Sequence, residues 1–276
     1  MSDYKSRIID RKVQKYLSVF GAVCIEGPKW CGKTWTSRYH SKSEYLVGDP
    51  GNNFQNRQLA ELSPSVILAG ETPRLIDEWQ EVPPIWDAVR YETDKRGKKG
   101  QFILTGSSKP KIKGVLHSGA GRIGKIRMRP MSLYESGNSK GLVSLKKLCE
   151  GEMQNVLSGD VDLYKLTDHI IRGGWPGNQD VSIDEAALLP LEYLNSIIDD
   201  DMNRIDDIKR DKRKIRLLLR SLARNESTSA TNRTLMNDIK EIDDEDIDKD
   251  TVAAYLDIFG RLFLTDNQEP FATKIR

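Results

Sequence analysis

The sequence is poor in the residues that build disulfide frameworks and zinc sites. Its 276 residues include three cysteines, Cys24, Cys31 and Cys149. Their spacing fits neither a disulfide scaffold nor a metal-binding cysteine motif, and reduced thiols are expected. Histidine is equally scarce, with three widely separated copies. These shortages argue against a zinc enzyme and against a nucleophilic triad that depends on histidine.

Long apolar runs are also absent. No stretch reaches the roughly 18 apolar residues that a transmembrane helix needs. The first twelve residues, MSDYKSRIIDRK, are charged throughout and offer no apolar signal core. We therefore expect a cytoplasmic protein without membrane contact. The 43 basic and 41 acidic residues nearly cancel, so any nucleic-acid contact would have to come from a local basic patch.

What the sequence does contain is a series of short apolar runs typical of buried strands. They start near residues 22, 45, 74, 101 and 125. Segments long enough for helices lie between them, and a helix over 8–20 precedes the first run. This alternation predicts an α/β fold with a parallel sheet.

The strand pattern stops near residue 140. Residues 141–204 are expected to form a helical linker or lid, with a break at Gly173-Gly174-Trp175-Pro176-Gly177. The final segment, 205–276, has the pattern of three short helices followed by a strand at 261–265, which is the order of a winged helix-turn-helix. We therefore expect three regions: a core at 1–140, the helical segment, and a winged-helix-like domain.

The most specific motif is the phosphate-loop pattern G-x-x-x-x-G-K-[ST], matched in full at residues 27–34. Its glycines let successive backbone N–H groups face phosphate oxygens, and Lys33 adds a charge between the β- and γ-phosphates. The hydroxyl of Thr34 can ligate Mg²⁺, and the helix that begins there points its positive end at the same anion. We interpret Cys31 as a small filler residue rather than a redox-sensitive thiol. The predicted nucleotide contacts are Gly27, Pro28, Lys29, Trp30, Cys31, Gly32, Lys33, Thr34 and Trp35.

The apolar run at 74–76 ends in two carboxylates, Asp77 and Glu78. In a sheet of this kind the strand lies beside the phosphate loop, so Asp77 would hold the magnesium shell, usually through water. Glu78 would polarise the attacking water as a general base or an orienting group. A nucleotide kinase has no need of such a residue, so Glu78 favours hydrolysis over phosphate transfer to another acceptor.

Hydroxyl side chains follow the next strand, at Thr105, Ser107 and Ser108. Ser107 is the first candidate for contact with the γ-phosphate or the attacking water, and Thr105 is the second. Capping of the following turn explains these hydroxyls equally well. Both interpretations stay open at this point.

An arginine, Arg122, follows on a glycine-rich turn. It is a candidate arginine finger, in its own subunit or in a neighbouring one, and such a residue contributes about 10³–10⁵ in rate where it operates. A solvated basic surface and a contact to nucleic-acid phosphates are the alternatives. The same stretch carries Lys109, Lys111, Lys113, Lys125, Arg127 and Arg129.

In this order, the strings GPKWCGKT, LIDEWQEVP, FILTGSS and SGAGRIGKIRMRPMSLYE resemble the AAA+ ATPase superfamily. More narrowly, they are similar to prokaryotic AAA-type ATPases with a C-terminal domain of unknown function. The narrow part of the resemblance is Asp-Glu-Trp-Gln at 77–80, together with Pro130, Ser132 and Glu135. The resemblance covers residues 4–140 well, and the Gly-Gly-Trp-Pro string more weakly.

The resemblance implies a sheet of order 5-1-4-3-2 with a winged helix after the core. It assigns Lys33 and Thr34 to the phosphate and magnesium site, Asp77 to the metal, Glu78 to water activation and Arg122 to the finger. It also implies a nuclease-like domain after the winged helix. Since the chain stops at Arg276, just past an apolar run, we expect a truncated C-terminal region.

A winged helix raises the question of DNA binding. An acidic run at 238–250 leads directly into the third helix, where it would repel phosphates. DNA binding through that helix is therefore less favoured than protein packing or a lid role. A basic cluster before it remains a possible electrostatic contact and contains Lys209, Arg210, Lys212, Arg213, Lys214, Arg216 and Arg220.

The sequence thus predicts a magnesium-dependent ATPase of the AAA+ type, with ATP and Mg²⁺ as cofactors. Hydrolysis would drive a conformational change in a protein partner or in the C-terminal module. A homo-oligomer follows if Arg122 acts between subunits. The alternatives are a DNA-binding regulator that ATP switches with little turnover and, less favoured, a small-molecule kinase. No guanine-recognition motif Asn-Lys-x-Asp is present, which leans towards ATP.

Overall fold

The computed structural model describes residues 4–108, 115–152, 155–157, 159–202, 208 and 210–268. These residues fall into two compact units, a larger one within 4–192 and a smaller one that begins at Tyr193. Within the described ranges, no helix is both long enough and apolar enough to span a bilayer. Each unit is considered separately below.

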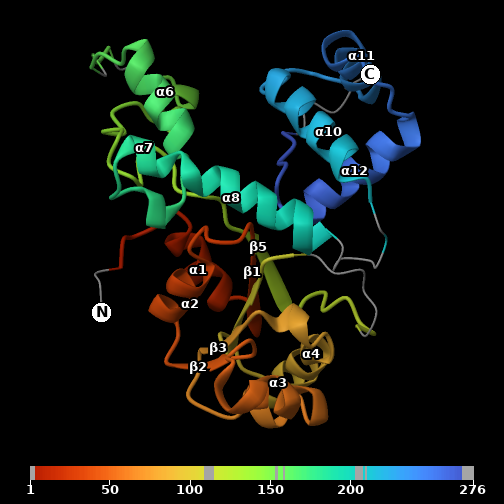
Figure 1. Ribbon diagram of the computed structural model, residues 1–276. Helices are drawn as coiled ribbons and strands as arrows, with labels where there is room; N and C mark the ends of the chain where they lie inside the picture. Colours follow the sequence, from red (N-terminus) through yellow and green to blue (C-terminus); the bar gives the residue numbers. More distant parts are fainter. Residues whose placement is uncertain are drawn as a thin grey trace, which may run out of the picture. The chain divides into compact units, whose positions relative to one another are not determined.

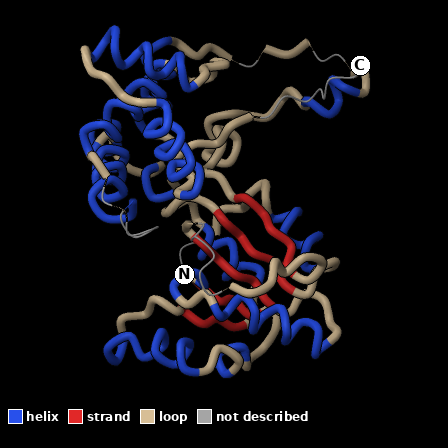
Figure 2. Tube along the Cα trace, turned by 90° about the vertical axis from the view of Figure 1, so that its right-hand side faces the viewer, coloured by secondary structure: helices blue, strands red, loops and turns tan. Residues whose placement is uncertain are grey.

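A five-stranded parallel sheet forms the centre of the larger unit (Figures 1 and 2). The strand order is β2-β3-β4-β1-β5, which is the order 5-1-4-3-2 read from the opposite edge. The predicted parallel α/β sheet is therefore confirmed. Its strands are β1 (Ala22–Glu26), β2 (Ser43–Leu46), β3 (Arg74–Asp77), β4 (Phe102–Gly106) and β5 (Ile123–Arg127).

Helices cover both faces of this sheet, which explains why its central strands are apolar on both sides. Val13 of the first helix packs with Val23 and Ile25 on one face. Alternate residues such as Cys24 and Leu104 face the other cluster. The helices around the sheet are α1 (Asp10–Leu17), α2 (Lys33–His40), α3 (Gly51–Leu62) and α4 (Pro84–Arg96), with short 3₁₀ turns η1 (Val66–Leu68) and η2 (Trp79–Glu81).

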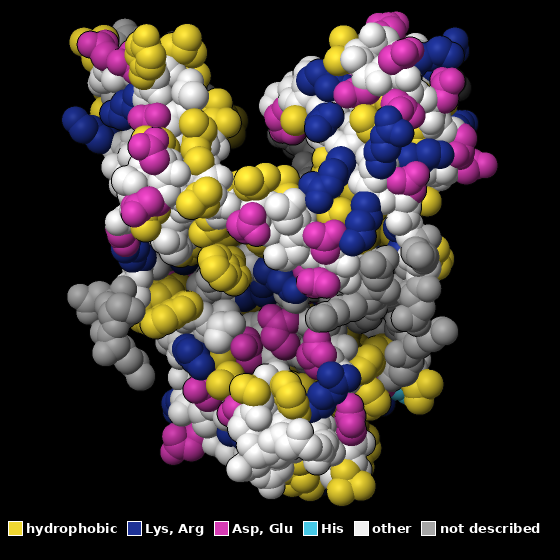
Figure 3. All heavy atoms as spheres, viewed as in Figure 1, with side chains coloured by type: hydrophobic (Ala, Val, Ile, Leu, Met, Phe, Trp, Pro, Cys, Tyr) yellow, Lys and Arg dark blue, Asp and Glu magenta, His cyan; other side chains and the backbone are white. Residues whose placement is uncertain are grey.

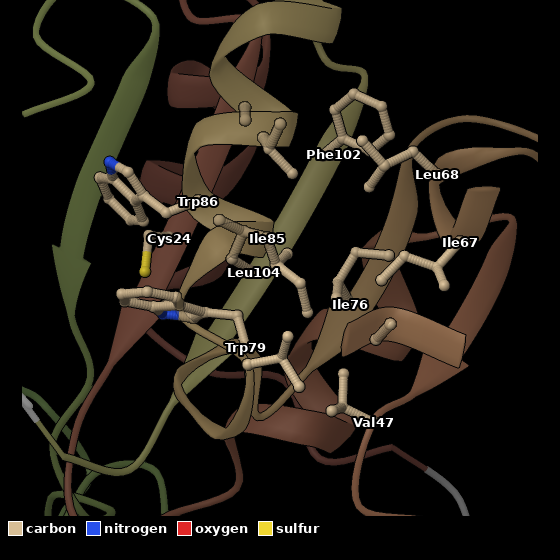
Figure 4. Packing of buried hydrophobic residues seen from close by; sticks show 14 of the residues in the cluster. Cys24, Val47, Ile67, Leu68, Ile76, Trp79, Ile85, Trp86, Phe102 and Leu104 are labelled. Atoms are coloured by element: carbon tan, nitrogen blue, oxygen red, sulfur yellow. The ribbon is translucent and has the colours of Figure 1, made fainter. Parts of the chain in front are cut away.

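Two tryptophans organise the α4 face of the core (Figure 4). The rings of Trp79 and Trp86 lie 4.9 Å apart with an interplanar angle of 42°. Cys24 lies beside them, while Ile85 and Leu104 continue the cluster. Each large side chain buried here stabilises the fold by roughly 1.5–3 kcal/mol relative to exposure. The cluster lies just past the end of β3, where Trp79 begins η2 one residue after Glu78.

The part of the larger unit after β5 is helical, as predicted. The expected break falls at Gly173, where φ is +63°. The next residue, Gly174, accepts a hydrogen bond from the Met131 N–H at 2.6 Å. A Cβ on Gly174 would lie 2.3 Å from the Met131 carbonyl oxygen, so only glycine fits. The elements are α5 (Leu145–Cys149), α6 (Leu163–Arg172), η3 (Pro176–Asn178), α7 (Ile183–Ala186) and the start of α8 (Leu188–Ser196), which runs past Tyr193 into the residues of the smaller unit.

The smaller unit contains the three predicted helices around a core that includes Leu218, Ile239 and Phe259. Each begins with a side-chain cap, from Asp211, Thr231 and Asp248 respectively. The elements of this unit are the π-helix η4 (Ile197–Asp201), α10 (Lys212–Arg224), α11 (Asn232–Asp243) and α12 (Lys249–Arg261).

The strand predicted at 261–265 is wrong. Helix α12 continues through Gly260 to Arg261 and ends in a turn, with Phe263 at φ +59°. Its apolar residues Ile258, Phe259 and Leu262 follow helical spacing into the unit's own core, so this run is buried without a strand partner. The wing of a winged helix is thus not formed within 210–268. Residues 269–276, where a truncated ending was expected, lie outside the described residues.

Candidate functional site

The phosphate-loop motif connects β1 to α2 at the carboxyl end of the sheet. A Cβ on Gly27 would lie 2.2 Å from the Met128 carbonyl oxygen, which makes glycine obligatory there. Gly32 has φ +101°, a conformation that favours glycine. Lys33 is 5% exposed, and its Nζ donates to the Pro28 carbonyl at 2.8 Å. The ammonium group therefore lies across the loop, where the motif requires it.

Three oxygen-bearing side chains converge beside the loop. Thr34 Oγ1 donates to Asp77 Oδ1 at 3.0 Å, and Thr105 Oγ1 donates to the same oxygen at 2.5 Å. Adjacent oxygens of an octahedral magnesium shell are separated by about 2.9 Å, because Mg–O distances are about 2.0–2.1 Å. Thr34 and Asp77 therefore fit a magnesium site in both donor chemistry and spacing.

The ionisation of Asp77 is under opposing influences. Burial raises the pKa of the Asp77 carboxyl above its ordinary value, because the charged form loses solvent. The hydroxyls of Thr105 and Thr34 act in the opposite direction by donating to the carboxylate. A nearby cation would further favour the charged form. The site is thus arranged so that a bound cation and the ionised carboxylate stabilise each other.

Glu78 is held from three directions. Its N–H donates to Thr105 Oγ1 at 2.9 Å, while Ser107 Oγ donates to Glu78 Oε2 at 2.8 Å. Gln80 Nε2 donates to the same carboxylate oxygen and, at 3.3 Å, to Ser107 Oγ. The backbone of Glu78 is left-handed, with φ +57°, which costs a non-glycine residue on the order of 1–3 kcal/mol. Strain of this kind and a clamped carboxylate are typical of a positioned functional group.

Arg122 is not brought to this site. It directly precedes β5, and its carbonyl accepts from the Ala22 N–H at 3.0 Å, at the amino end of the sheet. Its Nε donates to Asp94 at 2.9 Å, and its side chain is half exposed. Because the phosphate loop lies at the opposite end of the strands, Arg122 does not reach the loop of its own subunit. The prediction that stays open is that Arg122 acts as an arginine finger at the nucleotide site of a neighbouring subunit.

The other basic residues near Arg122 are divided between described and undescribed parts of the chain. Lys109, Lys111 and Lys113 lie outside the described residues. Lys125 pairs with Glu26 at 3.5 Å and lies over the Trp86 ring. This part of the predicted basic stretch therefore has partners within the larger unit.

A cavity of about 220 Å³ adjoins the loop on the α2 side. Trp35 is half exposed there, and Tyr4 reaches α2 by a 3.0 Å contact to Thr36 Oγ1 and by stacking on Tyr39 at 4.4 Å. Pro176 brings the Gly-Gly-Trp-Pro string to the same place. The lining residues are Tyr4, Lys5, Arg7, Gly32, Trp35, Thr36, Met131, Pro176 and Asp180.

Two residues at the site carried no role in the sequence analysis. Gln80 was noted only as part of the Asp-Glu-Trp-Gln string, and its place two residues after Glu78 gave no reason to expect a contact to the carboxylate. Arg7 precedes the first helix and gave no signal of its own. Glu135, which pairs with Arg7, was quoted only as part of the family resemblance and did not point to Arg7.

The parallel sheet, the phosphate loop and the acidic end of β3 together define a domain of the P-loop NTPase class. A family model described as an AAA domain matches residues 20–137. A second model, a domain of unknown function (DUF8612), matches residues 163–276. The resemblance to AAA-type ATPases noted from the motifs is therefore confirmed for residues 20–137, which match the AAA domain model.

Other similar proteins add little about activity. Uncharacterized proteins of Mycobacterium tuberculosis and Mycobacterium bovis are each 29% identical over 120 residues, which are 42% of this chain and 27% of theirs. The matched part thus spans about a quarter of these relatives. A Walker-type ATPase of Pyrococcus abyssi aligns with a TM-score of 0.49 at 13% identity, over 94% of this chain and 90% of that one. The FIGL-1 AAA domain in complex with ADP aligns with a TM-score of 0.37 at 13% identity, over 95% of this chain and 90% of that one.

Proposed function

We propose that the larger unit binds ATP with Mg²⁺ and hydrolyses the bond between its β- and γ-phosphates, releasing ADP and inorganic phosphate. The observation that carries the proposal is the convergence of Lys33, Thr34, Asp77 and Glu78 at one end of the sheet, with Thr34 Oγ1 and Asp77 Oδ1 separated by 3.0 Å. A buried lysine, a hydroxyl and two acids in this arrangement provide the charges that phosphoryl transfer requires.

Each side chain has a distinct part in this proposal. Thr34 and Asp77 would hold Mg²⁺, directly or through water, and the ion would supply positive charge to the phosphates. Lys33 exchanges the Pro28 carbonyl for phosphate oxygens. Glu78 orients the attacking water and accepts its proton, while Ser107 and Gln80 keep the carboxylate in place.

The cavity beside the loop fits the base and ribose of the nucleotide. It starts at Gly32, where the triphosphate would end, and is lined by aromatic and apolar groups from Trp35, Tyr4 and Pro176. Such surfaces suit a flat heteroaromatic base. Competition of GTP with labelled ATP tests the choice of base, and we expect ATP to bind more tightly.

Residues 141–204, which in sequence follow the core at 1–140 and precede the segment 205–276 expected as winged-helix-like, are proposed to act as the lid of this site. The support is that Pro176 lines the cavity and Gly174 is hydrogen-bonded to Met131. A segment attached this way would respond to a nucleotide in the cavity. Hydrolysis would then drive a conformational change in the C-terminal module or in a protein partner.

The test is release of inorganic phosphate from ATP, measured with Mg²⁺ and with EDTA. We expect phosphate release that needs Mg²⁺ and is lost in Lys33→Ala. Lys146→Ala is the matched control, because Lys146 is an exposed lysine on α5 with a surface pair to Glu150. No magnesium-dependent release above the Lys33→Ala background would contradict the hydrolytic function.

The alternative of an ATP-switched DNA-binding regulator finds less support in the charges of the smaller unit. Figure 3 shows Lys and Arg side chains over α10 intermixed with acidic ones. Lys212, Arg213 and Arg220 have ionic partners in Asp199, Glu245 and Asp243. A gel-shift assay at physiological salt, with and without ATP, tests this alternative, and we expect no ATP-dependent shift.

A further inference from the structure

Arg7 lies outside the segment that matches the AAA domain, yet its side chain is buried against the phosphate loop. The side chain is 5% exposed, and three of its nitrogens each donate a hydrogen bond. Nη1 donates to the Cys31 carbonyl at 2.8 Å, Nη2 to the Arg129 carbonyl at 2.9 Å, and Nε to Glu135 Oε1 at 2.9 Å. One guanidinium thus ties the loop to the chain after β5.

The contact to Cys31 fixes the direction of a peptide group inside the loop. In a trans peptide the carbonyl and the following N–H point to opposite sides. Holding the Cys31 carbonyl on Arg7 therefore turns the Gly32 N–H away from the guanidinium, and backbone N–H groups of such loops are the donors that phosphate oxygens accept from. A Cβ on Gly32 would lie 3.1 Å from Arg7 Nη1, so the close approach also depends on glycine.

Glu135 holds Arg7 and is itself held. Its Oε2 accepts from the Ser132 N–H at 2.8 Å and from Ser132 Oγ at 3.0 Å, and its Oε1 accepts from the Ile8 N–H at 2.8 Å. Burial raises the pKa of Glu135, but these hydrogen bonds and Arg7 outweigh it and leave the pKa below its ordinary value. Ser132 and Glu135 of the Pro-x-Ser-x-x-Glu string thus hold the Arg7 side chain in position.

We propose that Arg7, held by Glu135, is a positioning residue that sets the Cys31–Gly32 peptide of the phosphate loop for binding of the nucleotide's phosphates. This inference rests on the proposed function and deepens it. Arg7 acts on binding through the loop backbone, and Glu78 and Asp77 act on the chemical step. We therefore expect nucleotide affinity to depend on Arg7. We expect the rate at saturating ATP to be independent of it.

The experiment compares Arg7→Lys with wild type by ATP affinity, kcat and amide hydrogen exchange of residues 27–34 without nucleotide. Lysine keeps the charge but cannot reproduce the three-point geometry of the guanidinium. We expect a Kd for ATP weaker by about 10-fold, an unchanged kcat, and faster exchange confined to the loop. Arg11→Lys, an exposed arginine of α1, is the matched control and should change none of these.

A second variant and the exchange data keep the proposal open to refutation. Arg7→Lys combined with Glu135→Gln should weaken binding by less than the product of the single effects, because both act through one network. Unchanged affinity together with unchanged loop exchange would overturn the proposal, as would a uniform rise in exchange across the sheet. If wild type binds no ATP, the proposed function fails, while loop exchange still decides whether Arg7 fixes the peptide.

Discussion

The two ends of the parallel sheet differ in what the strands deliver to them. At the carboxyl end, the phosphate loop follows β1, Asp77 and Glu78 lie at the end of β3, and Ser107 follows β4. These residues lie close together. At the amino end, Arg122 emerges before β5 and pairs with Asp94 on the surface. Both ends carry charged residues that look functional in the sequence. The difference is that, among the residues the structure describes, the carboxyl end is where side chains from several strands surround one space.

The comparison shows why position in the topology decides between charged residues of similar appearance. In an open parallel sheet, ligands bind beyond the carboxyl ends of the strands. Glu78 follows its strand, and Arg122 precedes its own. Substitutions at the carboxyl end should therefore alter binding or turnover, while those at the amino end should not in an isolated subunit.

The largest effect at the carboxyl end is expected for Lys33→Ala. Removing the buried ammonium group leaves the phosphate charge without its main protein counter-charge, so ATP affinity should fall by at least about 100-fold, or about 2.7 kcal/mol. Isothermal titration calorimetry measures this directly. Unchanged affinity would mean that the loop does not hold the triphosphate.

A smaller effect is expected for Ser107→Ala. Glu78 loses one donor worth roughly 1 kcal/mol but keeps Gln80, so kcat should fall by about 5-fold with KM unchanged. Steady-state kinetics measure this split, with Ser108→Ala as the neighbouring control. A rise in KM at constant kcat would instead place Ser107 on the nucleotide itself.

The Arg7–Glu135 pair predicts a pH-dependent stability at the same end of the sheet. Because the pKa of Glu135 is lowered on folding, its contribution is fully present above its ordinary value of 4.5 and is lost as pH falls through the folded value. Glu135→Gln should thus destabilise the protein by about 3 kcal/mol near neutral pH. Denaturant unfolding at several pH values checks this, and a difference from wild type that does not shrink below pH 4.5 would contradict it.

The smallest effect is expected for Arg122→Ala at the amino end. Its exposed pair with Asp94 contributes about 0–1 kcal/mol to stability, and dilute protein should hydrolyse ATP at the wild-type rate. If wild-type specific activity rises with protein concentration, the variant should lose that rise, since the finger would act between copies. If Arg122→Ala lost activity in dilute, monomeric protein, the amino end of the sheet would also contribute to turnover, which would contradict this comparison.

Much of the fold was predictable because its signals are local. Apolar runs separated by helical segments indicated the parallel sheet, and the loop motif placed its carboxyl end. The sequence analysis left the location of Arg122 open, although the residue directly precedes β5. The turn after α12 was not predictable, because Leu262 and Phe263 are buried by tertiary packing and an apolar run of that length suits a strand equally well.

Residues that act through distant partners gave no usable signal. Arg7 meets Glu135 across 128 positions of sequence, and an isolated arginine before a helix is ordinarily a surface residue. Gln80 contacts Glu78 only because the left-handed backbone at Glu78 turns the chain back. Such contacts follow from the folded backbone, whereas the phosphate loop is encoded by its own residues.

The central claim is that the site at the carboxyl end of the sheet hydrolyses the ATP it binds. In this account Glu78 orients the attacking water and accepts its proton. Glu78→Gln tests it most directly, when ATP affinity and phosphate release are measured on the same preparation. The account predicts wild-type affinity and phosphate release slowed by about 10²–10⁴-fold, the usual contribution of a positioned general base. Phosphate release at the wild-type rate would contradict it.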